Sequence, residues 1–149
     1  MGRRVEASLV RMNKGNWQNA WIRKLILRIY RIYGEGYAFL GESFCEDEFG
    51  MKRPEKGTKE VDGYIGNYAI QVMFKWVTEE DISSRYVTVK SDAEFDILII
   101  VCADNPDDGV RLFGAWEKWQ VEKARRNKSQ DRVMLKDLDK LDRFQIKKI

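Results

Sequence analysis

Apolar and polar residues alternate along residues 68–76, where the hydrophobic pattern of the chain is clearest. The even positions, Tyr68, Ile70, Val72, Phe74 and Trp76, are all apolar, whereas the odd positions are Ala69, Gln71, Met73 and Lys75. Successive side chains of a β-strand point to opposite faces, so this alternation predicts a strand with one core face. Its other face either carries chemistry or meets water. Residues 61–66 precede it across a Gly66-Asn67 turn, which predicts a β-hairpin.

Other segments predict helices before and after a sheet. Helical spacing of apolar residues predicts a basic amphipathic helix over 17–33 and an acidic helix over 37–48. Further along, the patterns predict a strand buried on both faces at 95–103, a strand at 110–116 and a helix at 117–126. Residues 78–93 are ambiguous, with a short helix at 79–84 and a brief strand at 86–90 as one interpretation, and 127–149 read as a polar break and a basic tail. This order indicates an α/β fold with a mixed sheet.

Length and composition narrow the class of protein. A chain of 149 residues with 44% hydrophobic content suits one domain spanning 1–149. Cys45 and Cys102 form no CxxC pair, and neither a secretory leader nor a long apolar run is visible, so we expect a cytoplasmic protein without a membrane segment. The chain has no histidine, which excludes histidine-based zinc sites and histidine general bases.

Charge is distributed unevenly along the chain. Residues 1–33 hold eight Lys/Arg and one acid, and the predicted C-terminal arm, 117–149, holds eleven against six. Residues 34–66 hold four Lys/Arg against eight acids, and residues 67–116 hold four against nine. An acidic centre between basic ends suits a metal site flanked by phosphate-binding surfaces. The alternative interpretation is that these charged segments are ordinary solvent-exposed surfaces with no binding role.

The acidic centre contains residue types that metal-assisted phosphodiester hydrolysis requires. Carboxylates hold a divalent ion that acidifies the attacking water and neutralises charge on the phosphate, and a lysine can position or deprotonate that water. The chain offers Glu42 on the acidic helix, Asp62 before the hairpin turn, and Gln71 and Lys75 on the following strand. Each also has a structural interpretation: Asp62 as a turn residue, Glu42 as a solvated helix acid and Gln71 as an exposed amide.

Residues 36–103 resemble the core of the PD-(D/E)XK nuclease superfamily. The resemblance rests on Gly41-Glu42 with Phe49-Gly50, on Asp62-Gly63, and on Gln71-Val72-Met73 at the position of the (E/Q)-x-K element. It implies a restriction-endonuclease-like α/β core, with a mixed central β-sheet flanked by helices, and a Mg²⁺-dependent endodeoxyribonuclease of the restriction or homing type, in which Mn²⁺ may substitute. It further implies a catalytic group of Glu42, Asp62, Gln71, Met73 and Lys75, with the ion held by Asp62, Glu42, the Gln71 side chain or the Val72 carbonyl.

Met73 departs from the superfamily pattern, because it occupies the motif lysine position. In one interpretation Lys75, two residues further along the same face, leans back into the site. In the other, Met73 marks a site that no longer cleaves, either naturally or by replacement, and the chain is a DNA-binding repressor or competitor. A protein-interaction domain that binds no nucleic acid is a third interpretation.

The basic ends of the chain would bind the phosphate backbone of double-stranded DNA. The predicted phosphate contacts are the basic side chains Arg23, Lys24, Arg28, Arg31, Arg125, Arg126 and Lys128. Cleavage of both strands requires two active sites, so a chain of this size is expected to act as a homodimer or a higher symmetric homo-oligomer.

Overall fold

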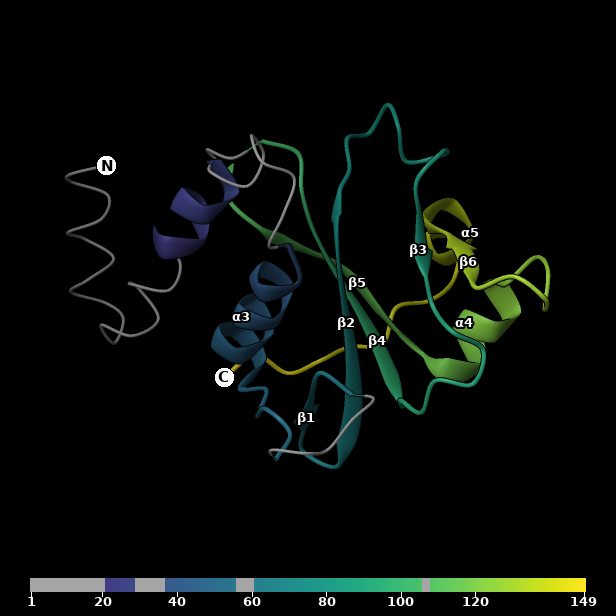
Figure 1. Ribbon diagram of the computed structural model, residues 1–149, viewed down its shortest axis with the longest axis horizontal. Coiled ribbons are helices and arrows are strands. Elements are labelled where there is room, and N and C mark those ends of the chain that lie inside the picture. Colours follow the sequence, from purple (N-terminus) through teal and green to yellow (C-terminus); the bar gives the residue numbers. More distant parts are fainter. Residues whose placement is uncertain (1–20, 29–36, 56–60, 106–107) are drawn as a thin grey trace.

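The structure, a computed structural model, describes residues 21–28, 37–55, 61–105 and 108–149. Its centre is a mixed sheet in the order β1 (Gly63–Ile65), β2 (Tyr68–Trp76), β4 (Ile97–Ala103), β5 (Arg111–Glu117) (Figure 1). β2 is antiparallel to β1 and parallel to β4, and β5 is antiparallel to β4. The mixed α/β architecture and the hairpin predicted from the sequence are therefore confirmed.

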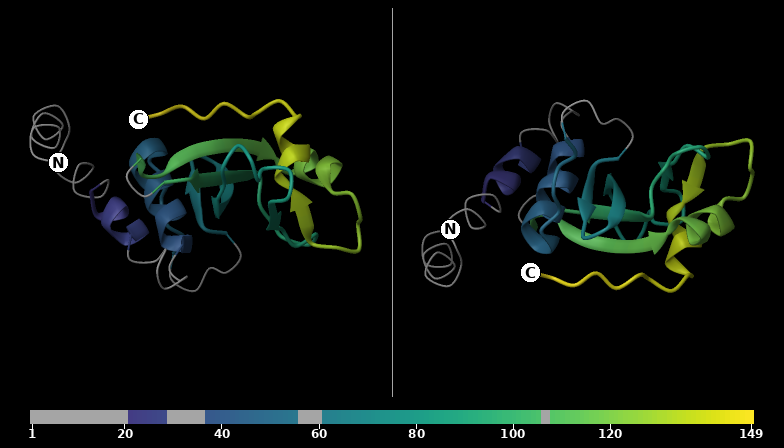
Figure 2. Two further views of the ribbon diagram at one scale, coloured as in Figure 1. Left: turned by 90° about the horizontal axis from the view of Figure 1, so that it is seen from above. Right: turned by 90° about the horizontal axis from the view of Figure 1, so that it is seen from below.

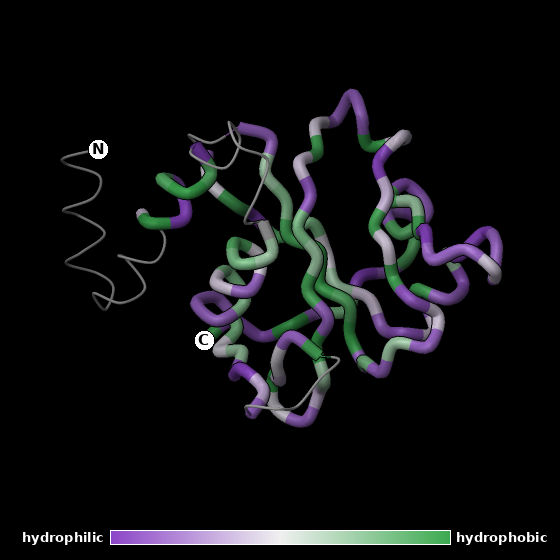
Figure 3. Tube along the Cα trace, viewed as in Figure 1, coloured by the Kyte–Doolittle hydropathy of each residue, from purple (hydrophilic) through white to green (hydrophobic). Residues whose placement is uncertain are grey.

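Strand β4 lies in the interior of this sheet. It is paired on both edges, and every residue from Ile97 to Ala103 is buried. The strand is the continuous hydrophobic stretch at the centre of the molecule in Figure 3. An uninterrupted apolar run is what a strand covered on both faces requires, which is why its position could be predicted.

Helix α3 (Tyr37–Phe49) covers one face of the sheet. Its Phe44, Cys45 and Phe49 pack against Ile70 and Val72 of β2 and against the side chains of β4 that face the same way. The helix approaches β2 closely at Gly41, where an added Cβ atom would lie 2.9 Å from Val72 Cγ1. The helix ends at Gly50, whose positive φ of 67° favours glycine. The even-numbered positions of β2 thus form the core face beneath α3.

The opposite face of the sheet is covered by a second group of elements. These are β3 (Tyr86–Thr88), β6 (Arg132–Met134), α4 (Lys118–Ala124) and α5 (Leu135–Asp139), with β3 and β6 forming their own antiparallel pair. Their apolar residues enclose Leu98, Ile100 and the fully buried Trp116. Figure 1 shows α3 to the left of the sheet and this group to the right.

The last residues of the chain return along the sheet towards α3. The Phe144 N–H donates to the Ala115 carbonyl of β5 at 2.7 Å, and the Ile149 N–H donates to the Glu48 carbonyl of α3 at 3.1 Å. Figure 2 shows this yellow segment extended along one side of the molecule. The end of the predicted basic C-terminal arm is therefore tied to both β5 and α3.

Three predictions are corrected or limited. Residues 79–84 form turns rather than a helix, because Asp81 accepts hydrogen bonds from the Thr78 N–H and from Arg85 and so favours a turn over helix formation. Strand β6 and helix α5 replace the irregular basic tail. Of the predicted helix 17–33, only residues 21–28 are described, and they are helical.

Candidate metal centre

Asp62 lies at a bulge where β1 begins. The Asp62 N–H donates to the Ile70 carbonyl at 2.9 Å, and the next residue, Gly63, is paired with Ile70 in the β1–β2 ladder. Two residues of one strand therefore lie opposite one residue of the other, which is a β-bulge. The Asp62 Oδ2 atom accepts the Val72 N–H at 2.7 Å. This bond replaces a ladder bond that the irregular strand start leaves out, and it fixes the carboxylate beside the α3 face of β2.

Helix α3 brings Glu42 to the same place. The pKa of Glu42 is raised above its ordinary value, chiefly by burial; Arg53 opposes the shift, while the charge of Asp62 and a hydrogen-bonding interaction with it add to it. Asp62 is therefore close enough to Glu42 for its charge to disfavour ionisation of the Glu42 carboxyl. Glu42 and Asp62 therefore form an acid pair, as the sequence predicted for these two residues.

Arg53 is the cation next to the acid pair. Its Nη1 atom lies 3.0 Å from Glu42 Oε2, and its Nε atom is hydrogen-bonded to Glu46 one turn further along α3. The arginine side chain is 43% exposed, and its guanidinium is held between the two glutamates. The sequence analysis did not select Arg53, because the only signal was the general basic character of the loop after the helix.

Cys45 lies beneath the acid pair and is fully buried. Burial raises the pKa of its thiol to about 12, and the negative charges of Asp62 and Glu42 add to the effect. Cys45 therefore packs in the core beneath α3 as a protonated thiol.

The strand residues of the predicted constellation lie on the other face of β2. Val72 packs beneath α3, whereas Met73 packs against the core on the opposite face and Lys75 Nζ lies 5.2 Å from the ring centroid of Tyr86 in β3. Gln71 lines a cavity on that same far face together with Met73. The structure thus brings Glu42 and Asp62 together but separates them from Gln71, Met73 and Lys75. The alternation of side chains along β2 is the physical reason.

The residues at the acid pair suit a hard divalent cation with few protein ligands. In the described part of the chain, no group of three or more His, Cys, Asp or Glu side chains is gathered as a metal site would be. Mg²⁺ is commonly held by only one or two carboxylates, and water and substrate phosphate complete its coordination. Glu42 and Asp62 supply such a pair, and Val72 contributes the N–H that orients Asp62.

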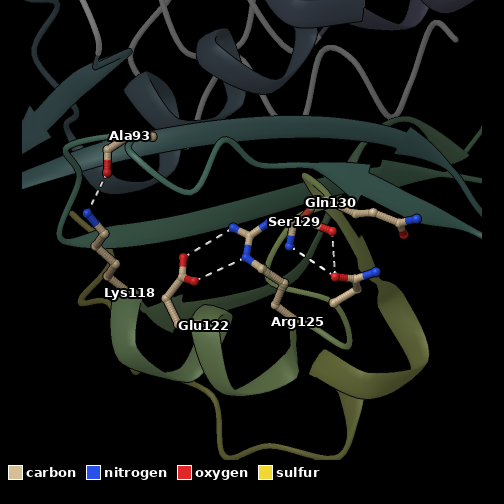
Figure 4. Close-up of polar contacts among 7 residues, drawn as sticks. Ala93, Lys118, Glu122, Arg125, Ser129 and Gln130 are labelled. Atoms are coloured by element: carbon tan, nitrogen blue, oxygen red, sulfur yellow. Dashed lines mark hydrogen bonds and ion pairs between the residues drawn. The ribbon is translucent and has the colours of Figure 1, made fainter.

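Two of the predicted DNA contacts are buried instead, Arg23 and Arg125. Arg23 is 5% exposed and forms an ion pair with Asp47 of α3, with a further hydrogen bond to Ser43 at 3.2 Å. Arg125 binds both carboxylate oxygens of Glu122 at 3.1 Å and the Gln130 carbonyl at 2.8 Å (Figure 4). These arginines join secondary-structure elements, so their prediction as DNA contacts is wrong.

The other predicted contacts remain at the surface or lie outside the described residues. Lys24 rests against Gly109, Arg28 is exposed and Lys128 is exposed. Arg126 binds Asp137 through two hydrogen bonds but keeps 60% of its side chain exposed. Arg31 lies outside the described residues.

Comparisons with known proteins add no relative. A scan against protein-family models matches none of them, and neither the search of the curated proteins nor the search of the solved structures finds a match. Among the described residues, no helix is both long enough and apolar enough to cross a membrane.

Proposed function

We propose that this chain is a Mg²⁺-dependent endodeoxyribonuclease with a restriction-endonuclease-like core, in which Mn²⁺ can replace Mg²⁺. The observation that supports this most is the acid pair, in which Glu42 of α3 and Asp62 at the start of β1 meet beside β2. The order of helix, aspartate, hairpin and buried strand also agrees with the resemblance seen in the sequence. The substrate would be double-stranded DNA cut at internal phosphodiester bonds, as in restriction or homing enzymes.

Each residue of the centre has a distinct role in this proposal. A divalent ion held by Glu42 and Asp62 would lower the pKa of the attacking water and offset charge on the phosphate. Asp62 is held in one orientation by the Val72 N–H, which reduces the cost of ordering it when an ion binds. Glu42, whose pKa is raised, can give up a proton when a positive charge arrives. Arg53 is placed to bind a phosphate oxygen beside the pair.

A second function on the same fold is a DNA-binding protein that does not cleave, such as a repressor or competitor. Two observations favour it. Met73, at the motif lysine position, packs against the core, and Lys75 is engaged with Tyr86 on the face away from the acid pair. No lysine of the motif strand therefore lies beside Glu42, so water activation would depend on the ion and the two carboxylates alone.

The proposal extends to assembly and location. Two cuts in a duplex need two centres, so we propose a homodimer or a higher symmetric homo-oligomer. Both cysteines are free and buried, which agrees with a reducing, cytoplasmic setting.

Plasmid cleavage in Mg²⁺ and in Mn²⁺ tests the proposal. Asp62→Asn and Glu42→Gln each keep the shape of the side chain and remove its charge, so both should reduce cleavage by at least about a hundredfold if the pair holds the ion. Glu48→Gln is the matched control, because Glu48 lies on the same helix and its carboxylate faces Lys148 at 3.8 Å instead. Tight DNA binding without cleavage in either metal would establish the second function.

A further inference from the structure

A cavity of about 380 Å³ lies on the face of β2 opposite the acid pair. It is lined by Gln71 and Met73 of β2, by Thr88 and Val89 at the end of β3, and by Lys90 and Asp92 of the following loop. Its size falls in the range of small-molecule sites, and it combines apolar walls with a few polar groups. The function proposed for the acid pair makes no use of this cavity.

One cation, Lys90, lines the cavity, and two more lie on strands next to its lining residues. Arg132 stands opposite Thr88 in the β3–β6 ladder, and Lys75 follows Met73 along the same face of β2. Tyr86 links two of them, because its ring centroid lies 5.2 Å from Lys75 Nζ and 4.0 Å from Arg132 Cζ. Within the described ranges, none of the three forms an ion pair with a carboxylate.

Acids lie among these cations. Asp92 lines the cavity, and Asp131 precedes Arg132 and accepts the Val89 N–H through its backbone carbonyl at 2.7 Å. Because the three cations are not held in ion pairs by described residues, they are available to an anion. Most other exposed arginines of the described chain, such as Arg85 and Arg111, are instead paired with a nearby aspartate.

We infer that this cavity binds one nucleotide unit, with the base inside and the phosphate at the rim. Met73 offers apolar contact to the face of a base, and the Gln71 amide offers both a donor and an acceptor to its edge. Lys75, Lys90 and Arg132 are the groups that bind the phosphate. A base can enter a cavity only when it is unpaired, so the ligand is a free nucleotide or a nucleotide of a single strand. The inference rests on the proposed function for its choice of a nucleic-acid ligand.

Binding without metal tests this inference independently of cleavage. Fluorescence anisotropy of a labelled single-stranded oligonucleotide, measured in EDTA, gives the affinity, and competition with unlabelled nucleoside monophosphates separates a free nucleotide from a strand. Lys90→Met should weaken binding by about tenfold. It should also reduce the salt slope of the binding constant by about 0.7, the value for one phosphate contact on a single strand. Gln71→Leu should change the preference among bases and leave the salt slope unaltered.

Lys147→Met is the matched control. Lys147 lies beside Ile70 and Ile97 on the α3 side of the sheet, away from the cavity, so its loss should change the affinity less than twofold. Lys90 is exposed, and an unchanged melting temperature verifies that its replacement leaves the fold intact. Asp62→Asn should abolish cleavage yet keep this binding, which separates the two sites.

Two outcomes would overturn the inference. One is the absence of binding to both the oligonucleotide and the mononucleotides. The other is an equal loss in Lys147→Met and Lys90→Met, which would show general electrostatic attraction rather than a site. Competition by monophosphates at the affinity of the oligonucleotide would identify a free nucleotide as the ligand, and binding of the oligonucleotide alone would identify a strand.

Discussion

Replacement of Arg23 by methionine is expected to destabilise the protein strongly. The Arg23 and Asp47 side chains are 6% and 9% exposed, and they join the helical segment 21–28 to α3. The guanidinium also lies over the Phe44 ring, 5.8 Å from its centroid. Replacement of Arg23 breaks this buried ion pair by taking away its cation, which costs about 3 to 5 kcal/mol. For a chain of this length, that loss lowers the melting temperature by roughly 6 to 20 °C.

Thermal melts followed by circular dichroism measure this effect. Arg126→Met is the matched control, because Arg126 also binds an aspartate, Asp137, but keeps 60% of its side chain exposed. Its loss should change the melting temperature little, because solvent screens an ion pair at the surface. The double variant Arg23→Met/Asp47→Leu should recover part of the lost stability, since it replaces both members of the buried ion pair by apolar side chains. Equal melting temperatures for Arg23→Met and Arg126→Met would refute the reasoning.

Three further predictions concern the acid pair and its surroundings. The folded state raises the pKa of Glu42 above its ordinary value of 4.5, so ionisation of Glu42 lowers the stability of the protein as the pH rises above that value. Glu42→Gln lacks this loss, and in EDTA its melting temperature should rise relative to that of the unaltered protein between about pH 4 and about pH 7. A difference in melting temperature that shrinks over this range would contradict the pKa shift. Cys45, with a pKa of about 12, should resist iodoacetamide in the folded protein and react once unfolded, as mass spectrometry can show; rapid labelling at an unchanged melting temperature would speak against its burial. Met73→Lys should lower stability by about 1 to 3 kcal/mol, because it places a cation against the core, and should add no cleavage, because position 73 faces away from Glu42; new cleavage would place the nuclease site on the far face of β2.

The central strands and α3 could be predicted because burial shapes their sequences directly. β4 is apolar throughout since both of its faces are covered, and the Gly66-Asn67 turn marks the hairpin before β2. Strand β6 could not be predicted. It has only three residues, with Val133 alone buried, and it exists through its pairing with β3, which lies far away in the sequence. A strand that depends on one distant partner leaves little local pattern.

Only the Glu42 and Asp62 part of the candidate site could be predicted from local sequence. Glu42 and Asp62 could be grouped because a helix and a hairpin next to it in sequence also pack together. Gln71 was grouped with them in error, although the alternation of residues along β2 already shows on which face Gln71 lies. A helix packs on the apolar face of a strand, which in β2 is the even-numbered face, and Glu42 is a residue of that helix. An odd-numbered residue of β2 therefore points away from it.

Residue type alone does not show that Arg23 and Arg125 are buried in ion pairs. Asp47 lies 24 residues from Arg23, so only the folded chain brings these two together, whereas Glu122 is three residues before Arg125 and i,i+3 spacing on the predicted helix already places that pair side by side. A charge count locates basic surfaces on average but does not distinguish a buried arginine from a solvated one. Arg28, Lys24, Arg126 and Lys128 remain the candidates for contacts with DNA phosphates.

Titration of the metal-free protein with Mn²⁺, followed by electron paramagnetic resonance, tests the central claim most directly, because it detects the ion at the acid pair without requiring cleavage. We expect one Mn²⁺ bound per chain, with the affinity reduced at least about tenfold in Asp62→Asn and in Glu42→Gln and unchanged in Glu48→Gln. Absence of bound Mn²⁺ in the unaltered protein, or binding that persists at full strength in Asp62→Asn, would contradict the assignment of Glu42 and Asp62 as a metal centre.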